Sequence, residues 1–249
     1  IDAGAKQVVE VEVPESWKSC ADEGLFAPEV KGGKDDVVAF VKNIQAKVNA
    51  QEGNTLPVSA FNDYVDGSTP SGTAAYEKRG IAVDIPVWKS ENCIQCNRCA
   101  YVCPHAVIRP VALTEDELAK APEGTQAIDM IGMPGMKFTM TVSALDCTGC
   151  GSCANVCPGK KGEKALVMEN LEANAASQDV FDFGREIPVK PEVVAKFKPE
   201  TVKGSQFKQP LLEFSGACAG CGETPYAKLI TQLFGDRMYI ANATGCSSI

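Results

Sequence analysis

The stretch CIQCNRCAYVCP, from Cys93 to Pro104, decides the fold of this chain. Its four cysteines are separated by two, two and three residues, and a proline follows the last of them. The stretch CTGCGSCANVCP, from Cys147 to Pro158, repeats that spacing without change. The chain therefore contains an internal repeat, whose two halves carry most of its 12 cysteines.

This spacing is typical of proteins that hold two [4Fe–4S] clusters, and residues 80–170 resemble a bacterial two-cluster ferredoxin. In such proteins the first three cysteines of each motif bind one cluster, and the fourth binds the cluster of the other motif. The expected ligands are a first set, Cys93, Cys96, Cys99 and Cys157, and a second set, Cys147, Cys150, Cys153 and Cys103. Small residues in and after the loops let the backbone approach the inorganic core; they are Gly149, Gly151, Ser152 and Ala100.

Zinc and disulfide bonds are the alternatives for so many cysteines. Structural zinc is usually bound by two separated Cys-x-x-Cys pairs, without a third cysteine two residues on and a fourth before proline. Disulfides form in oxidising compartments, but the spacing favours thiolates bound to metal. His105 is the only histidine, and because each cluster already has four thiolates, we interpret it as a surface or packing residue.

Strand-like segments flank both cysteine loops. Apolar and β-branched residues predict strands at 81–87, 106–113, 136–142 and 165–169. The longer gap between the two motifs indicates an insertion, which carries one short helix from Thr114 to Lys120. Each half of the repeat is therefore expected to run strand, cysteine loop, short helix and strand.

The regions outside the repeat differ from it in composition. Apolar residues at helical spacing predict an amphipathic helix over 34–50, and turn-forming residues predict a loop over 62–80. Four prolines between 188 and 210 are typical of a linker, or of a strap along another domain. Residues 210–249 then read as strand, helix and strand, which suggests the opening of an α/β domain.

Charge and hydropathy exclude some classes of protein. The net charge of −8 and the pI near 4.9 argue against a surface for nucleic acid or anionic membranes. The sequence contains no apolar run long enough to span a bilayer. Because the first residue is Ile1 and the last residues stop within a turn-rich motif, we expect an internal piece of a longer polypeptide.

A third Cys-x-x-Cys pair, Cys218 and Cys221, opens the last segment. Nearby glycines allow a tight loop, and Pro225 stands where a helix would begin. A helix N-terminus suits a negatively charged cluster or a phosphate. Cys246 is a candidate third ligand from the end of the next strand. From spacing alone, a third iron–sulfur site, a zinc site and ordinary buried thiols all stay open.

A family resemblance bears on this choice. Residues 216–249, GACAGCGETPYAKLITQLFGDRMYIANATGCSSI, resemble the start of the thiamine-diphosphate domain of the pyruvate:ferredoxin (flavodoxin) oxidoreductase family. Residues 72–88, GTAAYEKRGIAVDIPVW, resemble that family's short domain named for its Glu-Lys-Arg, here Glu77, Lys78 and Arg79. The two-cluster insert lies between them in the family's order, so the resemblance covers essentially the whole chain. For Glu77–Arg79 we expect at most an anchoring role, through Arg79.

The resemblance implies further site residues. Cys218, Cys221 and Cys246 would hold a third [4Fe–4S] cluster close to the thiamine, with its fourth ligand beyond residue 249. Glu223 and Cys246 would line the thiamine diphosphate pocket, and the Mg²⁺ site would lie outside this piece. No catalytic residue is assigned, and Cys20 is expected to be a free thiol.

The predicted fold class is α+β. We expect the tail of a preceding domain plus the EKR-type segment over 1–79, and a two-[4Fe–4S] ferredoxin domain over 80–170. A linker or strap should follow over 171–210, and the start of a thiamine-diphosphate domain over 211–249.

The resemblance implies CoA-dependent oxidative decarboxylation of pyruvate to acetyl-CoA and CO₂. Electrons would pass through three [4Fe–4S] clusters to ferredoxin or flavodoxin, in a cytoplasmic, anaerobic homodimer. Two alternatives stay open: the same mechanism on another 2-oxoacid, and an electron-wiring subunit without catalysis of its own.

Overall fold

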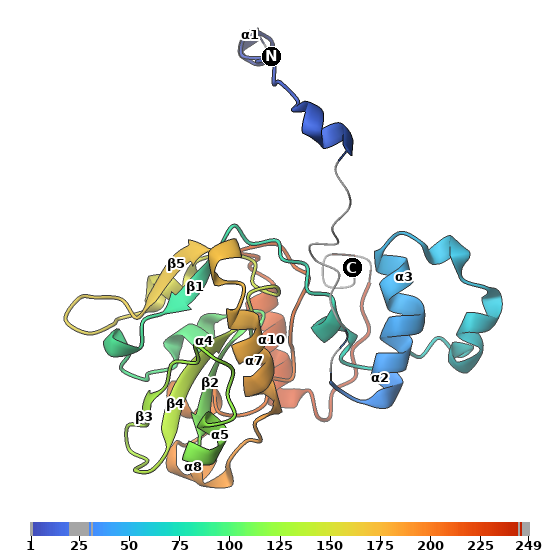
Figure 1. Cartoon of the computed structure of the whole chain (residues 1–249). Helices are drawn as coiled ribbons and strands as arrows, with labels where there is room; N and C mark the ends of the chain where they lie inside the picture. The colour runs from blue at the N-terminus through green and yellow to red at the C-terminus, as the bar shows by residue number, and fades with distance from the viewer. Residues whose placement is uncertain (1, 20–29, 31, 244, 246–249) are drawn as a thin grey trace.

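The computed structural model describes residues 2–19, 30, 32–243 and 245. It mixes helices with two small sheets (Figure 1). An N-terminal segment with α1 (Asp2–Lys6) and a 3₁₀ turn (Glu15–Ser19) stands apart from the other elements in the view of Figure 1. None of the helices in the described ranges is long and apolar enough to cross a membrane.

Two antiparallel sheets flank the cysteine loops. The first pairs β1 (Asp84–Trp88) with β5 (Leu166–Asn170), and the second has the order β2 (Ile108–Leu113), β4 (Lys137–Val142), β3 (Ile128–Asp129). Trp88 lies opposite Leu166, so the strand entering the first loop pairs with the strand leaving the second. The four strands predicted around the two motifs are confirmed.

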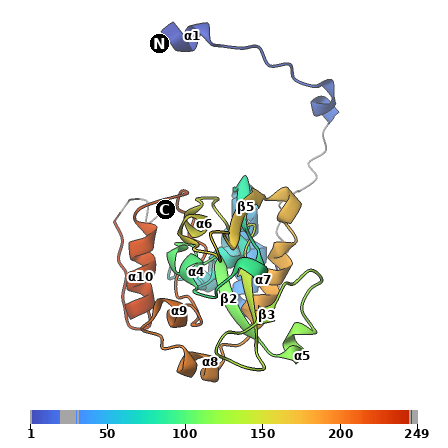
Figure 2. The same cartoon turned by 90° about the vertical axis from the view of Figure 1, so that its left-hand side faces the viewer.

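Two short helices, α4 (Arg98–Val102) and α6 (Ser152–Val156), follow the cysteine loops and contact each other. Figure 2 shows them between α10 and the sheets. Each helix ends at the fourth cysteine of its motif, Cys103 or Cys157, whose backbone is extended. The proline that follows disfavours helical backbone at that cysteine, and so ends the helix there.

The insertion between the motifs carries the predicted short helix, α5 (Glu115–Leu118). Thr114 caps it in a capping box, in which Thr114 and Glu117 each accept the other's backbone N–H. The helix is therefore set by local sequence, as predicted. The insertion also supplies β3, which the sequence analysis did not predict.

Residues 171–210, which were predicted to be a linker or strap, contain helices and contact both sheets. The strap carries three helices that were not predicted: α7 (Ser177–Glu186), α8 (Pro191–Lys196) and α9 (Val202–Ser205). α7 packs on β2 and β4 (Figure 1). Phe181, Val193 and Phe207 are buried, and the Phe207 ring meets Phe138 of β4 edge-on. These apolar anchors make the strap part of the core.

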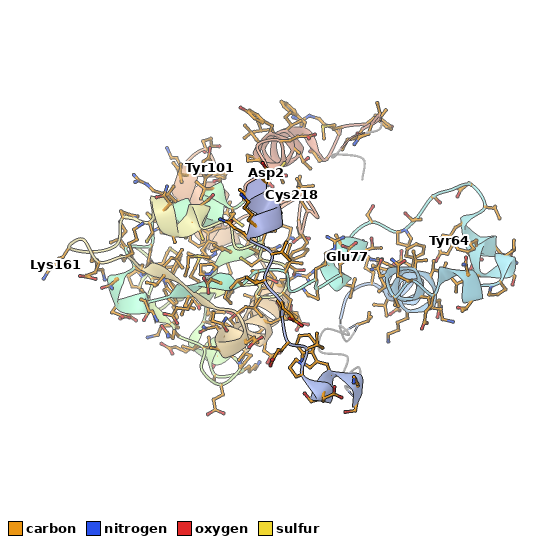
Figure 3. All side chains as sticks on the ribbon, turned by 90° about the horizontal axis from the view of Figure 1, so that it is seen from above. Asp2, Tyr64, Glu77, Tyr101, Lys161 and Cys218 are labelled. Atoms are coloured by element: carbon orange, nitrogen blue, oxygen red, sulfur yellow. The ribbon has the colours of Figure 1, made fainter. Side chains whose placement is uncertain are left out.

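The predicted N-terminal helix is confirmed. It runs as α2 (Asp35–Phe40), a π-helical turn (Val41–Gln45) and α3 (Ala46–Asn49). Its buried side chains are Val37, Val41 and Ile44. In Figure 3 the region around Tyr64 lies to one side of the main body, and the chain enters that body near Glu77.

The C-terminal segment carries the predicted helix, α10 (Thr224–Phe234). The strand predicted at 210–216 is wrong, because these residues are irregular. Their backbone N–H groups do not form the regular hydrogen bonds of a β-sheet. Leu211 N–H donates to the Gln232 side chain and Phe214 N–H to the carbonyl oxygen of His105. The described residues 239–243 also form no strand. An apolar segment becomes a strand only where another strand pairs with its backbone.

Candidate metal centres

The two cysteine loops share one backbone conformation. In the second loop, Gly149 and Gly151 have φ of 69° and 72°. The equivalent residues of the first loop, Gln95 and Asn97, have φ of 56° and 58°. All four are left-handed, a region that residues with a Cβ rarely adopt. The repeat seen in the sequence is therefore a repeat in structure, although only one loop uses glycine.

Side-chain hydrogen bonds hold the first loop in this conformation. The amide of Gln95 donates to the carbonyl oxygen of Asp129 at 2.7 Å and accepts from the Ile131 N–H at 2.8 Å. The amide of Asn97 donates to the carbonyl oxygen of Lys203 at 2.9 Å. Both side chains are buried. The sequence analysis missed these two residues; the available signal was a polar residue in one loop where the other has glycine.

The cysteines of the first set lie together. Cys93, Cys96, Cys99 and Cys157 all line one cavity. The Cys93 sulfur interacts electrostatically with those of Cys96 and Cys157. Cys157 comes from the second motif, so its sulfur joins the three cysteines of the first.

The second set shows the reciprocal arrangement. The sulfurs of Cys147 and Cys153 each interact with that of Cys103, which comes from the first motif, and with that of Cys150. The fourth cysteine of each motif thus faces the first three of the other. This is the exchange that a two-cluster ferredoxin requires.

Among the described residues, no group of three or more His, Cys, Asp or Glu side chains is placed so that it could hold a single metal ion. The preference for iron–sulfur clusters over zinc therefore rests on the spacing of the cysteines, because structural zinc is usually bound by two separated Cys-x-x-Cys pairs.

Burial makes these thiols poor acids. It raises the pKa of Cys147 and of Cys153 to about 12, and it also raises the pKa of Cys93 and Cys99. A thiolate there needs a neighbouring positive charge, which bound iron supplies. Backbone N–H groups also face the sulfurs, with Gly149 N at 3.4 Å from Cys147 Sγ and Ala165 N at 3.3 Å from Cys157 Sγ.

Cys221 lies in a different environment, at the N-terminus of α10. The backbone N–H and the hydroxyl of Thr224, together with the backbone N–H of Glu223, lower its pKa. Cys218 is exposed, and its carbonyl oxygen accepts the Cys221 N–H at 3.0 Å. The turn therefore favours the ionised form of the Cys221 thiol, which lies at the positive end of a helix.

Of the other two residues predicted for this third site, the structure describes Glu223 but not Cys246. Glu223 is exposed at the N-cap of α10, two residues after Cys221. The predicted ligand Cys246 and the leftover Cys20 lie outside the described residues. The structure thus brings Cys218, Cys221 and Glu223 into one turn.

Lys228 joins α10 to the second cysteine set. Its Nζ donates to the carbonyl oxygens of Cys103 at 2.7 Å and Ala100 at 3.1 Å, at the end of α4. His105, two residues after Cys103, is only 2% exposed, so it is a packing residue and not a surface residue. The third Cys-x-x-Cys turn is thereby docked on the helix that leads to Cys103.

The Glu77–Arg79 stretch contacts the same region, but not in the way expected. Arg79 pairs with Glu77 and is half exposed. Lys78 is the buried member, and its Nζ lies 2.5 Å from Asp146, the residue before Cys147. The anchor predicted at Arg79 is therefore found at Lys78.

Comparison with known proteins gives these sites a context. Residues 92–161 match a family model described as a 4Fe-4S dicluster domain, and residues 28–82 match EKR, described as a domain of unknown function. The whole chain is 51% identical to the pyruvate-flavodoxin oxidoreductase of Enterobacter agglomerans, and 53% identical to the pyruvate:ferredoxin oxidoreductase of Moorella thermoacetica. The chain matches one segment of the pyruvate oxidoreductases.

The match covers all of this chain but only part of each relative. The chain is covered in full, but it spans 20% of the length of each of those two relatives. It is also 46% identical, over its whole length, to 14% of a pyruvate dehydrogenase [NADP(+)] of Cryptosporidium parvum. The names of these three relatives therefore give different electron acceptors: flavodoxin, ferredoxin and NADP(+).

Proposed function

We propose that this chain is the electron-transferring segment of a CoA-dependent enzyme that oxidises pyruvate to acetyl-CoA and CO₂. The observation that carries the proposal is the 51–53% identity of the whole chain to one segment of two pyruvate oxidoreductases, together with two cysteine sets that exchange their fourth members. Oxidation of pyruvate with CoA to acetyl-CoA and CO₂ releases two electrons and one proton, and the segment passes the electrons to ferredoxin or flavodoxin.

The cysteines hold three [4Fe–4S] clusters in this proposal. The first and second sets bind one each, and Cys218, Cys221 and Cys246 contribute to the third. A bound cluster takes up and releases one electron at a time. The helix N-terminus at Cys221 favours a thiolate there. The buried cysteines of the other two sets are Cys93 of the first and Cys103, Cys147 and Cys153 of the second.

Thiamine diphosphate is proposed to bind next to the third cluster, with Glu223 and Cys246 lining its pocket. Its Mg²⁺ site and the binding site of CoA belong to parts of the enzyme outside this segment. The role of the segment is to bring a thiolate-rich turn to that pocket and to connect it, through α10, with the rest of the chain.

The proposed electron path runs from the third site to the second set and then to the first. Its first step is supported by Lys228 of α10, which donates to the carbonyl oxygen of Cys103. Its second step is supported by the interaction between the Cys99 and Cys153 sulfurs. Electrons would enter near Cys221 and leave near Cys157.

The proposed exit lies beside a loop with an excess of positive charge. The loop between α6 and β5 carries three exposed lysines, Lys160, Lys161 and Lys164, and one exposed glutamate, Glu163, although the whole chain has a net charge of −8. Figure 3 shows Lys161 at the end of the body opposite Tyr64. A basic rim next to Cys157 suits an acidic electron carrier, because complementary charge speeds encounter.

The proposal is tested on the full-length protein, purified without oxygen. Pyruvate is added with and without CoA, and reduction of ferredoxin, flavodoxin or a viologen dye is followed; 2-oxoglutarate and oxalate replace pyruvate in parallel. CoA-dependent reduction with pyruvate preferred supports the proposal. Preference for another 2-oxoacid would change the substrate. Reduction by none of them, with clusters present by EPR, would leave an electron-wiring subunit.

A further inference from the structure

The strongest feature that the proposed function leaves unused is Lys78 of the EKR stretch. Its backbone has φ of 41°, in the left-handed region that lysine rarely adopts. The residue lies between a 3₁₀ turn (Thr73–Tyr76) and β1. Such backbone strain persists only where surrounding contacts hold it, so the contacts of this side chain are informative.

The first contact is a buried ion pair. Lys78 Nζ lies 2.5 Å from Asp146 Oδ2, and the two side chains are 11% and 5% exposed. The same oxygen accepts the Ser143 hydroxyl at 2.6 Å. Asp146 immediately precedes Cys147, the first ligand of the second set. A buried carboxylate needs a partner of opposite charge, and Lys78 provides it at the edge of a cysteine loop.

The second contact reaches the segment that leads to the third site. The Lys78 ammonium lies 5.0 Å from the centre of the Phe214 ring, a cation–π distance. Phe214 is buried, has φ of 49°, and donates its N–H to the carbonyl oxygen of His105. It stands four residues before Cys218. The Lys78 side chain therefore contacts both the Cys147 loop and the segment that precedes the Cys218 turn.

Neighbouring residues extend the same junction. The Gly80 N–H donates to the carbonyl oxygen of Leu145 at 2.8 Å. Arg79 lies against Gly216, where an added Cβ would come within 2.6 Å of Arg79 Nη1. A pocket lies where the three segments meet, and Glu77, Thr148 and Ser215 are among its lining residues. Three consecutive residues, Lys78 and Arg79 of the EKR stretch and Gly80 after it, thus contact segments next to two cysteine sites.

We propose that Lys78 is a positioning residue, which fixes the Cys147 loop relative to the Cys218 turn. The EKR stretch then sets the separation and charge environment of two neighbouring clusters, while contacting neither cysteine directly. This inference rests on the proposed function, because it requires clusters at the second set and at the Cys218 turn. The rate of electron transfer between two clusters depends on their separation. A residue that fixes the Cys147 loop relative to the Cys218 turn therefore affects that rate.

The test compares Lys78→Met with Lys89→Met in the full-length protein. Lys89 pairs with Glu169 at the surface near the first set, so it is a matched loss of an ion-paired lysine. Dithionite reduces the clusters independently of pyruvate, and EPR then reports each cluster and the magnetic coupling between neighbours. For Lys78→Met we expect a lower reduction potential of the second cluster, changed coupling to the third, and about half of the second cluster lost. Lys89→Met should resemble wild type.

Two further variants separate charge from fold. Lys78→Arg keeps the cation and should retain the wild-type spectrum. Lys78→Met combined with Asp146→Asn removes both charges, so it should restore the potential and occupancy of the second cluster but not its coupling to the third. An unchanged potential and coupling in Lys78→Met would overturn the inference. Absence of clusters from dithionite-reduced wild type would instead overturn the proposed function.

Discussion

Lys228 Nζ donates to the carbonyl oxygen of Cys103 at 2.7 Å and so connects the helix of the third Cys-x-x-Cys turn to a ligand of the second set. Burial lowers the pKa of this lysine, and the nearby Cys103 sulfur partly offsets the change. The contact spans 125 positions of the chain. It gives the proposed electron path a structural joint between the thiamine-side turn and the two-cluster domain.

Loss of that joint should destabilise the protein. Lys228→Met removes two hydrogen bonds from a charged donor and leaves two carbonyl oxygens at the end of α4 without it. We expect about 2 kcal/mol less stability, measured as a fall of about 4–8 °C in the temperature at which the visible cluster absorbance bleaches. Lys208→Met, at an exposed lysine of the strap, should leave that temperature unchanged. Equal effects of the two variants would contradict the assigned role.

The exchange of fourth cysteines can be tested by pairs of substitutions. Cys93→Ala with Cys157→Ala should remove one cluster, because both residues belong to the first set. Cys93→Ala with Cys103→Ala should damage both clusters, since the residues belong to different sets. Iron content and the EPR spectrum of the reduced protein distinguish the outcomes. The reverse pattern would mean that each motif keeps its own fourth cysteine.

The second cysteine loop should tolerate a side chain at one glycine and not at the other. Both Gly149 and Gly151 are left-handed, but a Cβ on Gly149 would lie 3.2 Å from the Asp84 carbonyl oxygen and 3.3 Å from Ala82 Cβ. A Cβ on Gly151 meets nothing within 4 Å among the described atoms, and asparagine already stands at the equivalent Asn97.

Gly151→Asn should therefore change stability by less than about 0.5 kcal/mol, whereas Gly149→Asn should cost about 1–2 kcal/mol and reduce iron at the second set. Thermal bleaching and iron content measure both effects. If Gly149→Asn is as stable as Gly151→Asn, the close approach of β1 to this loop does not constrain it.

The lysine loop should govern encounter with the electron carrier. Lys161→Glu is expected to raise the KM for ferredoxin or flavodoxin about two- to fivefold at low ionic strength, because a charge at an interface rim acts mainly on the association rate. The effect should shrink as salt is added. Lys47→Glu, on the exposed side of α3, is the matched control. The rate of viologen dye reduction should be the same in both variants. A lower rate with the dye would mean that the substitution impairs electron transfer within the protein and not the encounter with the carrier.

Local patterns made much of the fold predictable. The cysteine spacing identified both loops, alternating apolar residues marked the four strands around them, and Thr114 marked the start of α5. These features depend on residues close together in sequence. The strand predicted at 210–216 failed because strand formation depends on a partner, and its donors instead bond to Gln232 and His105.

The residues that hold the cysteine loops in place were harder to predict, because they too depend on partners far away in the sequence. Gln95 and Asn97 hold the first loop through the carbonyl oxygens of Asp129 and Lys203, which lie 34 and 106 positions away. Lys78 reaches Asp146 across 68 positions. Single-sequence patterns do not contain such pairings. The ligand types could thus be predicted from sequence, whereas the residues that position them required the folded chain.

The most direct test of the central claim is EPR of the full-length protein, mixed with pyruvate and CoA without oxygen. The account predicts signals from reduced clusters at all three sites, and Cys218→Ala should suppress their reduction by pyruvate while dithionite still reduces the first and second sets. Reduction by dithionite but not by pyruvate in the unmodified protein would contradict the account, because electrons would then not enter this segment from the oxoacid.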